Sequence, residues 1–359
     1  MAKISNHLVI MAGGVGSRFW PMSTAERPKQ FIDVLGSGKT LLQMTVERFG
    51  SLVAAENVWV VTNERYAGMV AEQLPDLPRQ NILKEPCRRN TAPCIAYVSW
   101  RIKKKDPKAN IVVTPSDHVV FNIQEFQRVI AQCMEFTADS DAIVTLGMKP
   151  SRPETGYGYI QMNDDKPLSG DIFPVKSFTE KPDAEFAGIF LQEGNFLWNT
   201  GLLCFNARVM LDNLFQLVPE YRIEIPRMMA EAESDDPKLV PESFNVLPNY
   251  NMDVSILERS SNVFVQRGHF GWADLGTWAS IGKDAPSDSE GNVLLDTDAH
   301  LYECTGNIIR MPKGHTAVVK GLHDFVIAEE GEFLMICPRE DDAAMRRMHT
   351  DTKFGDTKS

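Results

Sequence analysis

The first 150 residues alternate two hydrophobic patterns, and this alternation limits the possible folds more than any other feature of the sequence. Four short apolar runs lack the polar alternation of half-exposed strands, which predicts buried strands at His7–Met11, Asn57–Thr62, Asn110–Thr114 and Ala142–Leu146. Between them, apolar spacings of three and four residues predict helices at Leu41–Phe49, Glu64–Leu74, Thr91–Lys104 and Ile123–Phe136. This order predicts an α/β, Rossmann-like fold, in which a mostly parallel sheet has helices on both faces. Ligands of such sheets bind beyond the carboxyl ends of the strands, so functional residues should follow the apolar runs.

The rest of the chain predicts a change of organisation. Further strands are expected near Tyr157–Met162, Val175–Thr179, Gly201–Phe205 and Asn262–Gln266, and helices at Pro182–Gln192, Ala207–Leu217 and Tyr221–Ala232. A polar linker at Lys283–Asn292 precedes short β-like segments. We therefore expect a catalytic domain over 1–284, a small β-rich C-terminal domain over 285–349, and a polar tail over 350–359. A short left-handed β-helix is one form that the β-rich domain could take.

Charge and cysteine content exclude several classes of protein. Asp and Glu number 48 against 37 Lys and Arg, a net charge of −11, whereas a nucleic-acid coat needs clustered basic residues. The six cysteines are scattered without a CxxC pair, which favours a reducing compartment over a structural zinc site. The apolar run near the N-terminus is too short for a signal peptide or membrane span. We expect a cytoplasmic protein without nucleic-acid or membrane partners.

A glycine-rich loop, Ala12–Arg18, follows the first apolar run directly. Glycines without Cβ let backbone N–H groups approach phosphates closely, and Arg18, Arg27 and Lys29 form a basic cluster in an acidic protein. The loop therefore favours a nucleoside triphosphate site over a plain strand–helix turn. A dinucleotide-binding GxGxxG is excluded because its third glycine would fall on Phe19.

A second glycine-containing segment, Gly36–Thr40, imitates the end of a P-loop. The first glycine of that motif would fall on Asp33, so we interpret Gly36–Thr40 as a turn and helix start.

The run AGGVGSRFWPMS, followed by RPKQF, resembles the signature of nucleoside-diphosphate-sugar pyrophosphorylases. More narrowly, it resembles bacterial mannose-1-phosphate guanylyltransferases (GDP-mannose pyrophosphorylases), through seven motif blocks in the family's order across residues 7–282. The resemblance implies a fold of the nucleotide-diphospho-sugar transferase type. It also implies transfer of GMP from GTP to α-D-mannose 1-phosphate, giving GDP-mannose and pyrophosphate. Some such enzymes carry a further isomerase domain of cupin type; only 75 residues follow residue 284, so we expect a single activity.

The resemblance assigns the nucleotide to the glycine-rich loop and to the segment KEPCRRNTAP at 84–93. Glu85 could accept hydrogen bonds from the N–H donors of guanine, and Asn90 could bond to base or ribose. The alternatives are that Glu85 pairs with neighbouring arginines and that Asn90 caps the following helix. The expected nucleotide-binding residues are Ala12, Gly13, Gly14, Gly16, Ser17, Arg18, Glu85, Asn90, Ser116 and Asp117.

Two aspartates match the metal-binding positions of the family. Asp117 follows a buried strand in PSDH, and Asp274 lies in GWADLGTW. Mg²⁺ prefers one or two carboxylates together with phosphate oxygens and water, which fits such a pair. Singly, either aspartate could be a turn residue or a helix cap. His118 has no partner pattern and receives no role.

Four residues match the sugar half of the family's site. They are Gly158 in ETGYGY, Glu180 and Lys181 in FTEKP, and Asn199 in FLWNTG. By resemblance, Glu180 and Asn199 contact the sugar and Lys181 binds its 1-phosphate. The alternatives are that Glu180 and Lys181 form a surface ion pair at the end of a strand, and that Asn199 is a buried turn residue bonded to the backbone. Asp253, in MDVSILE, is expected to orient the active-site loops.

The resemblance implies in-line attack of the sugar phosphate on the α-phosphorus of GTP. The nucleophile is already an anion, so alignment and charge neutralisation suffice. The expected catalytic residues are Arg18, Lys29, Asp117, Lys181 and Asp274. Alternatives are the same chemistry with another sugar or base, a non-catalytic regulatory nucleotide-sugar binder, and a P-loop GTPase. Homodimerisation through the C-terminal region is left open.

Overall fold

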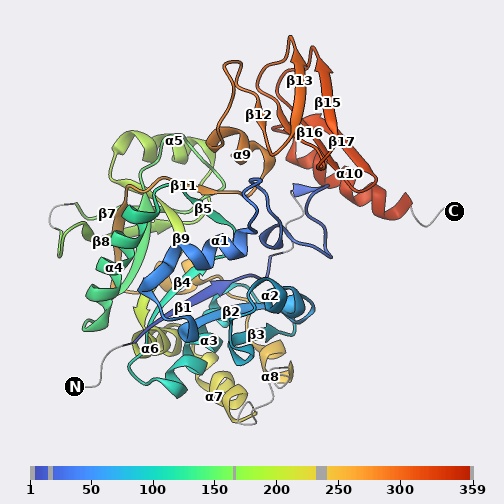
Figure 1. The fold of residues 1–359 in the computed structure, drawn as a ribbon. Helices are drawn as coiled ribbons and strands as arrows, with labels where there is room; N and C mark the ends of the chain where they lie inside the picture. Colours follow the sequence, from blue (N-terminus) through green and yellow to red (C-terminus); the bar gives the residue numbers. More distant parts are fainter. Residues whose placement is uncertain (1–4, 15–18, 165–166, 232–240, 356–359) are drawn as a thin grey trace. The chain divides into compact units, whose positions relative to one another are not determined.

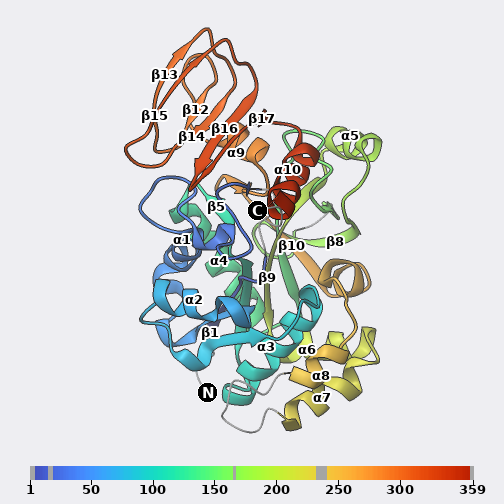
Figure 2. The same cartoon turned by 90° about the vertical axis from the view of Figure 1, so that its right-hand side faces the viewer.

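The computed structural model describes residues 5–14, 19–164, 167–231 and 241–355 (Figures 1 and 2). The chain divides into two compact, discontinuous units. Unit 1 comprises Met1–Gly13, Val46–Pro115 and Val120–Trp272, and unit 2 comprises Gly14–Thr45, Ser116–Val119 and Ala273–Ser359. Among the described residues, no helix combines the length and hydropathy that crossing a membrane requires.

Unit 1 is built on a nine-stranded mixed sheet of order β3–β2–β1–β4–β9–β6–β10–β8–β7. The strands are β1 (Asn6–Met11), β2 (Val58–Asn63), β3 (Ile82–Glu85), β4 (Asn110–Pro115), β6 (Ile143–Met148), β7 (Tyr159–Met162), β8 (Ile172–Thr179), β9 (Phe196–Asn206) and β10 (Val263–Gly268). Parallel pairing joins β3, β2, β1 and β4, and also β6 with β10. β8 and β9 run antiparallel to their neighbours.

The sheet corrects the predicted mostly parallel arrangement. Parallel pairing holds in the β3–β2–β1–β4 half, but β9 inserts in the opposite direction between β4 and β6. β7 pairs with both β8 and β9, so five strands close into a ring. An apolar run reports that a strand is buried and carries no information on its direction, which is why the sequence pattern missed this reversal.

Helices cover both faces of the sheet, as predicted. In β9, Leu203 and Phe205 belong to the core that includes α3 and α6, whereas Cys204 points the other way and contacts Cys133 of α4. The helices that begin in unit 1 are α2 (Ala67–Gln73), α3 (Thr91–Lys105), α4 (Ile123–Ala138), α5 (Ala184–Glu193), α6 (Ala207–Leu217), α7 (Tyr221–Glu231) and α8 (Pro241–Val246). α1 (Leu41–Phe49) begins in unit 2 and ends in unit 1.

Unit 2 contains the β-rich C-terminal part that was predicted. Its strands are β12 (Val293–Leu294), β13 (Asp298–Tyr302), β14 (Ile308–Arg310), β15 (Thr316–Lys320), β16 (Phe325–Glu330) and β17 (Phe333–Pro338). Two parallel ladders pair residues 18 positions apart, Asp298 with Thr316 and Ile308 with Val326, and a third pairs Val293 with Ile308, 15 positions apart. Stacked coils produce such pairing, and a left-handed β-helix stays a prediction.

Two helices and a short sheet complete unit 2. The helices are α9 (Trp278–Asp284) and α10 (Asp342–Gly355), so residues 350–355 of the predicted polar tail are helical. β5 (His118–Val120) pairs with β11 (Trp272–Asp274). The core of this unit joins Phe19 and Trp20 from the start of the chain to Trp278 and Met335 from its end.

The P-loop-like segment forms the expected turn. Asp33 accepts hydrogen bonds from the backbone N–H groups of Ser37 (2.9 Å) and Gly38 (2.6 Å), which a P-loop would direct at phosphates. Thr40 and Gln43 then cap α1 reciprocally.

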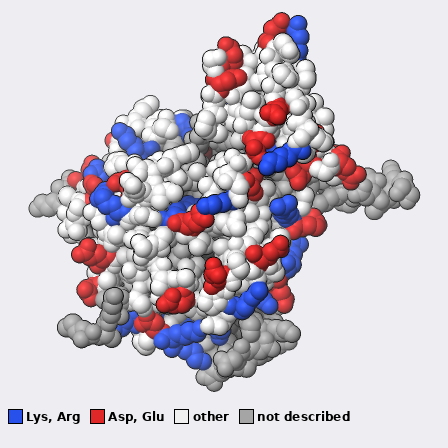
Figure 3. All heavy atoms as spheres, viewed as in Figure 1, with Lys and Arg blue, Asp and Glu red and all other residues white. Residues whose placement is uncertain are grey.

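On the face of the molecule shown in Figure 3, basic side chains are interspersed with acidic ones.

Candidate active site

The glycine-rich loop begins after Met11, the last residue of β1, and its first residue is hydrogen-bonded to β2. Ala12 donates its backbone N–H to the Val61 carbonyl (2.8 Å), and its own carbonyl accepts from the Thr62 hydroxyl (2.8 Å). A Cβ at Gly13 would lie 3.5 Å from Glu85 Oε2, so the loop starts beside the predicted base-binding carboxylate. In unit 2, the Gly14 carbonyl accepts from Gln30 Nε2 (2.8 Å). Gly16, Ser17 and Arg18 lie outside the described residues, so their predicted roles stay predictions.

Glu85 ends β3 as a buried acceptor. Burial raises its pKa to about 7, although a hydrogen bond from Cys94 and the charge of Arg88 lower it. Its Oε1 is closed off from solvent and has no hydrogen-bond partner among the described residues. A buried acceptor without a donor is costly, and the N–H groups of guanine would supply donors. Sequence reasoning missed Cys94, which gave no signal beyond its place in the α3 pattern.

Asn90 caps helix α3, which is the structural alternative considered for it in the sequence. Its Oδ1 accepts from the Thr91 backbone N–H (2.9 Å) and caps α3, while its backbone has a φ of 67°. A side chain in this left-handed region is strained, and such strain often accompanies binding sites. The side-chain nitrogen takes no part in the cap, so a role towards base or ribose stays a prediction.

Unit 2 brings both predicted metal aspartates together with Lys29. Asp117 lies in the short link between β4 and β5, and Asp274 ends β11, the strand paired with β5. Lys29 Nζ lies 2.8 Å from Asp117 Oδ2 and 3.9 Å from Asp274 Oδ1, and donates to the Leu275 carbonyl at 2.7 Å. Lys29 is buried, so the ammonium and the carboxylates compensate one another within the unit.

The charge of Lys29 controls the ionisation of Asp117. Burial raises the pKa of this carboxyl group, but Lys29 and His118 outweigh burial and lower it to about 2. Asp117 is therefore an anion throughout the neutral range. Ser116 beside it is buried and holds the link in place, since its carbonyl lies 3.3 Å from the Thr45 hydroxyl.

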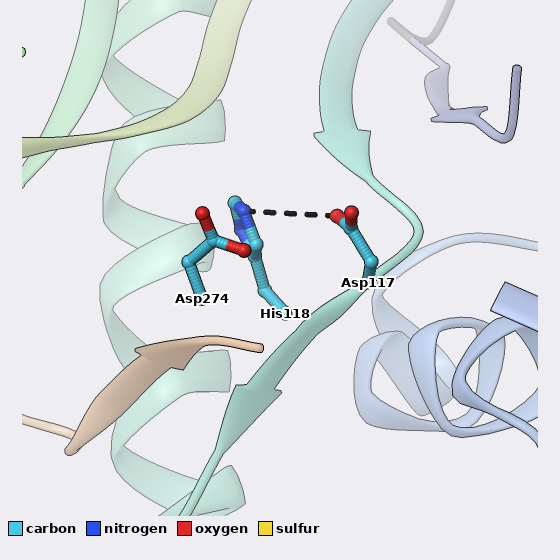
Figure 4. Close-up of side chains that lie close together, drawn as sticks. All are labelled: Asp117, His118 and Asp274. Atoms are coloured by element: carbon cyan, nitrogen blue, oxygen red, sulfur yellow. Dashed lines mark ion pairs between the residues drawn. The ribbon is translucent and has the colours of Figure 1, made fainter. Parts of the chain in front are cut away.

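His118, which received no role from the sequence, belongs to the same cluster. One ligand atom each from Asp117, His118 and Asp274 lie within 4.8 Å of one another. In Figure 4 the imidazole lies beside both carboxylates, with Nε2 3.8 Å from Asp117 Oδ1. Two carboxylates suit Mg²⁺ or Mn²⁺, and an imidazole widens the set of transition metals that fit. These residues form a candidate site for a divalent cation, here called the cation cluster: Lys29, Asp117, His118 and Asp274.

Unit 1 brings the predicted sugar residues together with Asp253, here called the sugar cluster: Gly158, Glu180, Lys181, Asn199 and Asp253. Lys181 Nζ pairs with Glu180 Oε1 at 2.8 Å and its side chain is 61% exposed, so it can reach a ligand. The Lys181 backbone has a φ of 46°, a second strained position at a predicted site residue. Asn199 Nδ2 donates to Asp253 Oδ1 at 2.9 Å.

Gly158 lies close to the Glu180 carboxylate. A Cβ there would lie 2.8 Å from Glu180 Oε2 and 3.3 Å from the Phe178 ring, so the end of the Glu180 side chain would have to shift. Its carbonyl accepts the Asn199 backbone N–H at 2.8 Å. The glycine thus lets the Glu180 carboxylate and the Asn199 strand approach each other.

Comparison with known proteins identifies the family of the chain. A model of the nucleotidyl transferase family matches residues 7–290. A mannose-1-phosphate guanylyltransferase from Escherichia coli is 34% identical over 346 residues, covering 92% of this chain and 72% of that protein. Mannose-1-phosphate guanylyltransferase RfbM from Salmonella typhimurium is 32% identical over 338 residues, covering 92% and 69%.

Two solved structures share the fold, one of them over nearly the whole chain. A crystal structure from Thermus thermophilus, described as a mannose-1-phosphate geranyltransferase, has a TM-score of 0.87 and 27% identity, covering 98% of this chain and 100% of that one. A Helicobacter pylori mannose-6-phosphate isomerase structure shares the fold at a TM-score of 0.63 and 24% identity, over 76% of this chain and 100% of that one. The chain belongs to the nucleotidyl transferase family, and relatives 32–34% identical to it are mannose-1-phosphate guanylyltransferases.

Proposed function

We propose that the protein transfers GMP from GTP to α-D-mannose 1-phosphate, forming GDP-mannose and pyrophosphate. The observation that carries this proposal is the cation cluster: two aspartates from distant motifs meet beside a buried lysine. Carboxylates that hold a cation, with a lysine within 3.9 Å of both, are suited to neutralising phosphates during phosphoryl transfer. The guanylyltransferase relatives supply the choice of substrates.

The nucleotide side of the proposed mechanism depends on fixed positive charge and on a buried acceptor. Lys29 would donate to the departing pyrophosphate, together with Arg18. Glu85, whose Oε1 has no donor among the described residues, would accept from the guanine N–H groups. Gly13 and Gly14 would offer backbone N–H groups to the phosphates, whereas the Ala12 N–H is already bonded to the Val61 carbonyl, so Ala12 would only hold the start of the loop in place.

Asp117 and Asp274 would hold the divalent cation, with His118 as a further donor, and their donor set fits such an ion. When bound, the cation would neutralise phosphate charge that develops in the transition state. Lys29, which lies 2.8 Å from Asp117, must share or yield that carboxylate.

The sugar side supplies the nucleophile. Lys181, exposed and paired with Glu180, would bind the 1-phosphate of the sugar, and Glu180 would accept from sugar hydroxyls. The sugar phosphate is an anion at neutral pH, so the protein would orient its oxygen for in-line attack without removing a proton.

Several finer properties belong to the same proposal. We propose Mg²⁺ as the cation and a cytoplasmic location. We also propose a left-handed coil for the parallel ladders of unit 2, and 1–284 as the catalytic part of the chain. The parallel pairing of β13 with β15 and of β14 with β16 supports the coil.

A matrix of nucleoside triphosphates and sugar 1-phosphates, assayed for pyrophosphate, tests the function. We expect GTP with mannose 1-phosphate to give the highest kcat/KM. A preference for another pair would replace the substrates and keep the chemistry. Tight binding of GDP-mannose without turnover of any pair would favour a regulatory binder, and steady GTP hydrolysis without sugar would favour a GTPase.

A further inference from the structure

Strand β9 carries an irregularity at the sugar cluster. Against β6, Thr145 lies opposite Leu203 and Gly147 lies opposite Asn199, so β6 advances two residues while β9 advances four. The extra residues form a bulge whose Gly201 has a φ of 68°. The Thr200 hydroxyl donates to the Leu146 carbonyl at 3.0 Å and fixes the bulge to β6. Bulges of this kind commonly re-aim a side chain next to a site.

The side chain that this bulge aims is Asn199. The Gly201 backbone N–H donates to Asn199 Oδ1 at 3.1 Å, and the Thr145 hydroxyl lies 3.0 Å from the same oxygen and 3.3 Å from the Leu202 carbonyl. A backbone N–H can only donate, so the amide atom that faces it must be the oxygen. The Asn199 nitrogen therefore points to Asp253, to which it donates at 2.9 Å.

Asp253 is held between a donor and a like charge. It begins the π-helical turn Asp253–Leu257, is half-buried, and receives the Asn199 amide on one oxygen. Burial and the Glu180 charge raise its pKa to about 6, more than Asn199 and Lys181 lower it. Lys181 forms its 2.8 Å ion pair with Glu180 instead. Asp253 thus carries acceptor capacity that the described contacts do not exhaust, close to a carboxylate proposed to bind sugar hydroxyls.

We propose that Asp253 accepts a hydrogen bond from a sugar hydroxyl beside Glu180, and that Asn199 and Thr145 are the positioning residues that aim it. Two neighbouring carboxylates present acceptors to adjacent hydroxyls of one pyranose, which would let the cluster select among sugar 1-phosphates. The inference deepens the proposed function and rests on it for the sugar class.

The Asp253→Asn variant removes the charged acceptor and keeps the size of the side chain. We expect the KM for mannose 1-phosphate to rise about 10- to 100-fold, as for loss of a hydrogen bond to a charged group, with the KM for GTP changed by less than about twofold. Glu258→Gln is the control for charge. Glu258 is exposed and lies near Glu180, since burial and the Glu180 charge raise its pKa. The substitution therefore removes a negative charge close to Glu180 without touching the contact between Asn199 and Asp253. We expect it to behave as wild type.

A matched pair tests the positioning. Thr145→Val deletes the hydroxyl at nearly constant shape, and Thr145→Ser restores it. We expect the Val variant to raise the KM for mannose 1-phosphate and, in carboxyl-resolved NMR, to move the pKa of Asp253 upward, because the Asn199 amide is held less firmly. The Ser variant should restore both. Equal effects of Val and Ser would show that Thr145 only packs, and would overturn its positioning role.

Deoxy analogues of mannose 1-phosphate separate this inference from the proposed function. If Asp253 binds one hydroxyl, deleting that hydroxyl and substituting Asp253→Asn should be strongly non-additive in kcat/KM. An active wild type whose Asp253→Asn variant shows additive losses with every analogue would overturn the inference alone. A wild type that uses a different sugar phosphate would overturn the proposed substrate, and the same cycle with deoxy forms of that sugar would then decide the role of Asp253.

Discussion

The cation cluster of unit 2 and the sugar cluster of unit 1 treat a half-buried aspartate in opposite ways. Burial raises the pKa of both Asp117 and Asp253. Asp117, with Lys29 Nζ at 2.8 Å, nevertheless falls to about 2, whereas Asp253, with an amide at 2.9 Å, rises to about 6. Neighbouring charges decide the sign of the pKa shift: Lys29 and His118 lower the pKa of Asp117, whereas Glu180 adds to the effect of burial at Asp253.

The two clusters differ in how their charges are compensated before a ligand binds. In the cation cluster the protein provides its own counter-charge, so the Asp117 carboxylate stays ionised without a ligand. In the sugar cluster the lysine is engaged by Glu180, and Asp253 is left with acceptor capacity and incomplete compensation. The first arrangement suits binding of cations and phosphates, and the second suits neutral hydroxyl groups.

Removing the charge of Asp117 should have the largest effect. We expect Asp117→Asn to keep the fold and to lower pyrophosphate release from GTP and mannose 1-phosphate by at least about 10²–10³-fold, because a preorganised charge at the reacting phosphates is lost. Steady-state kinetics with circular dichroism checks both parts. Asp298→Asn, on the exposed start of β13, is the matched control. Near-normal turnover of folded Asp117→Asn would refute its role.

Removing the charge of Lys29, the partner of Asp117, should destabilise the fold. We expect Lys29→Met to lower the free energy of unfolding by about 2 kcal/mol at pH 7, because it removes the ammonium partner of the half-buried Asp117 carboxylate. Urea unfolding measures this, and Lys39→Met, at an exposed turn position, is the control. The double variant Lys29→Met with Asp117→Asn should recover most of the loss. Additive losses would mean that the pair is not coupled.

The lysine of the sugar cluster should act on one substrate. We expect Lys181→Ala to raise the KM for mannose 1-phosphate by about tenfold or more, as for loss of a charge-assisted contact, and to leave the KM for GTP nearly unchanged. Initial rates over both substrate concentrations separate the two constants. Equal increases in both would contradict the assignment of Lys181 to the sugar phosphate.

The buried acceptor Glu85 should give an effect that depends on pH and disappears at low pH. Its pKa in the folded protein is about 7, above the ordinary value of 4.5, so the folded state binds more protons between these values. Its contribution to stability is complete below about pH 4.5 and is lost as the pH rises to about 7. Glu85→Gln should therefore match wild type near pH 4 and exceed its unfolding free energy by about 3 kcal/mol at pH 8. Thermal melts across pH check this, with exposed Glu64→Gln as control; a difference that does not vary with pH would contradict it.

The sequence predicted those elements whose signal is local. α1 and α6 have the predicted bounds, and β1, β2, β4 and β6 lie within a residue or two of their apolar runs. The three-residue strands β5 and β11 were missed, because so short a segment has no readable periodicity. The direction of β9 was missed for the reason given above.

In the candidate site, too, the sequence predicted residues but not the contacts between them. Motif resemblance located Asp117, Asp274, Glu180 and Asn199, yet their contacts depend on the tertiary fold. The ion pair of Lys29 joins segments far apart in sequence, and His118 entered its cluster only through the pairing of β5 with β11. The bulge that aims Asn199 could not be predicted, since the apolar run of β9 does not reveal two extra residues.

The discontinuity of unit 2 has a consequence for the order of events during synthesis. Lys29 and Asp117 leave the ribosome early, but Asp274 and the core partners Trp278 and Met335 follow more than 150 residues after Asp117. The cation cluster therefore completes late, and a nascent chain can fold much of its sheet before any phosphate chemistry is possible. For the same reason, a truncation at residue 284 would remove Ile308, Val326 and Met335 from the core that also contains Phe19 and Trp20.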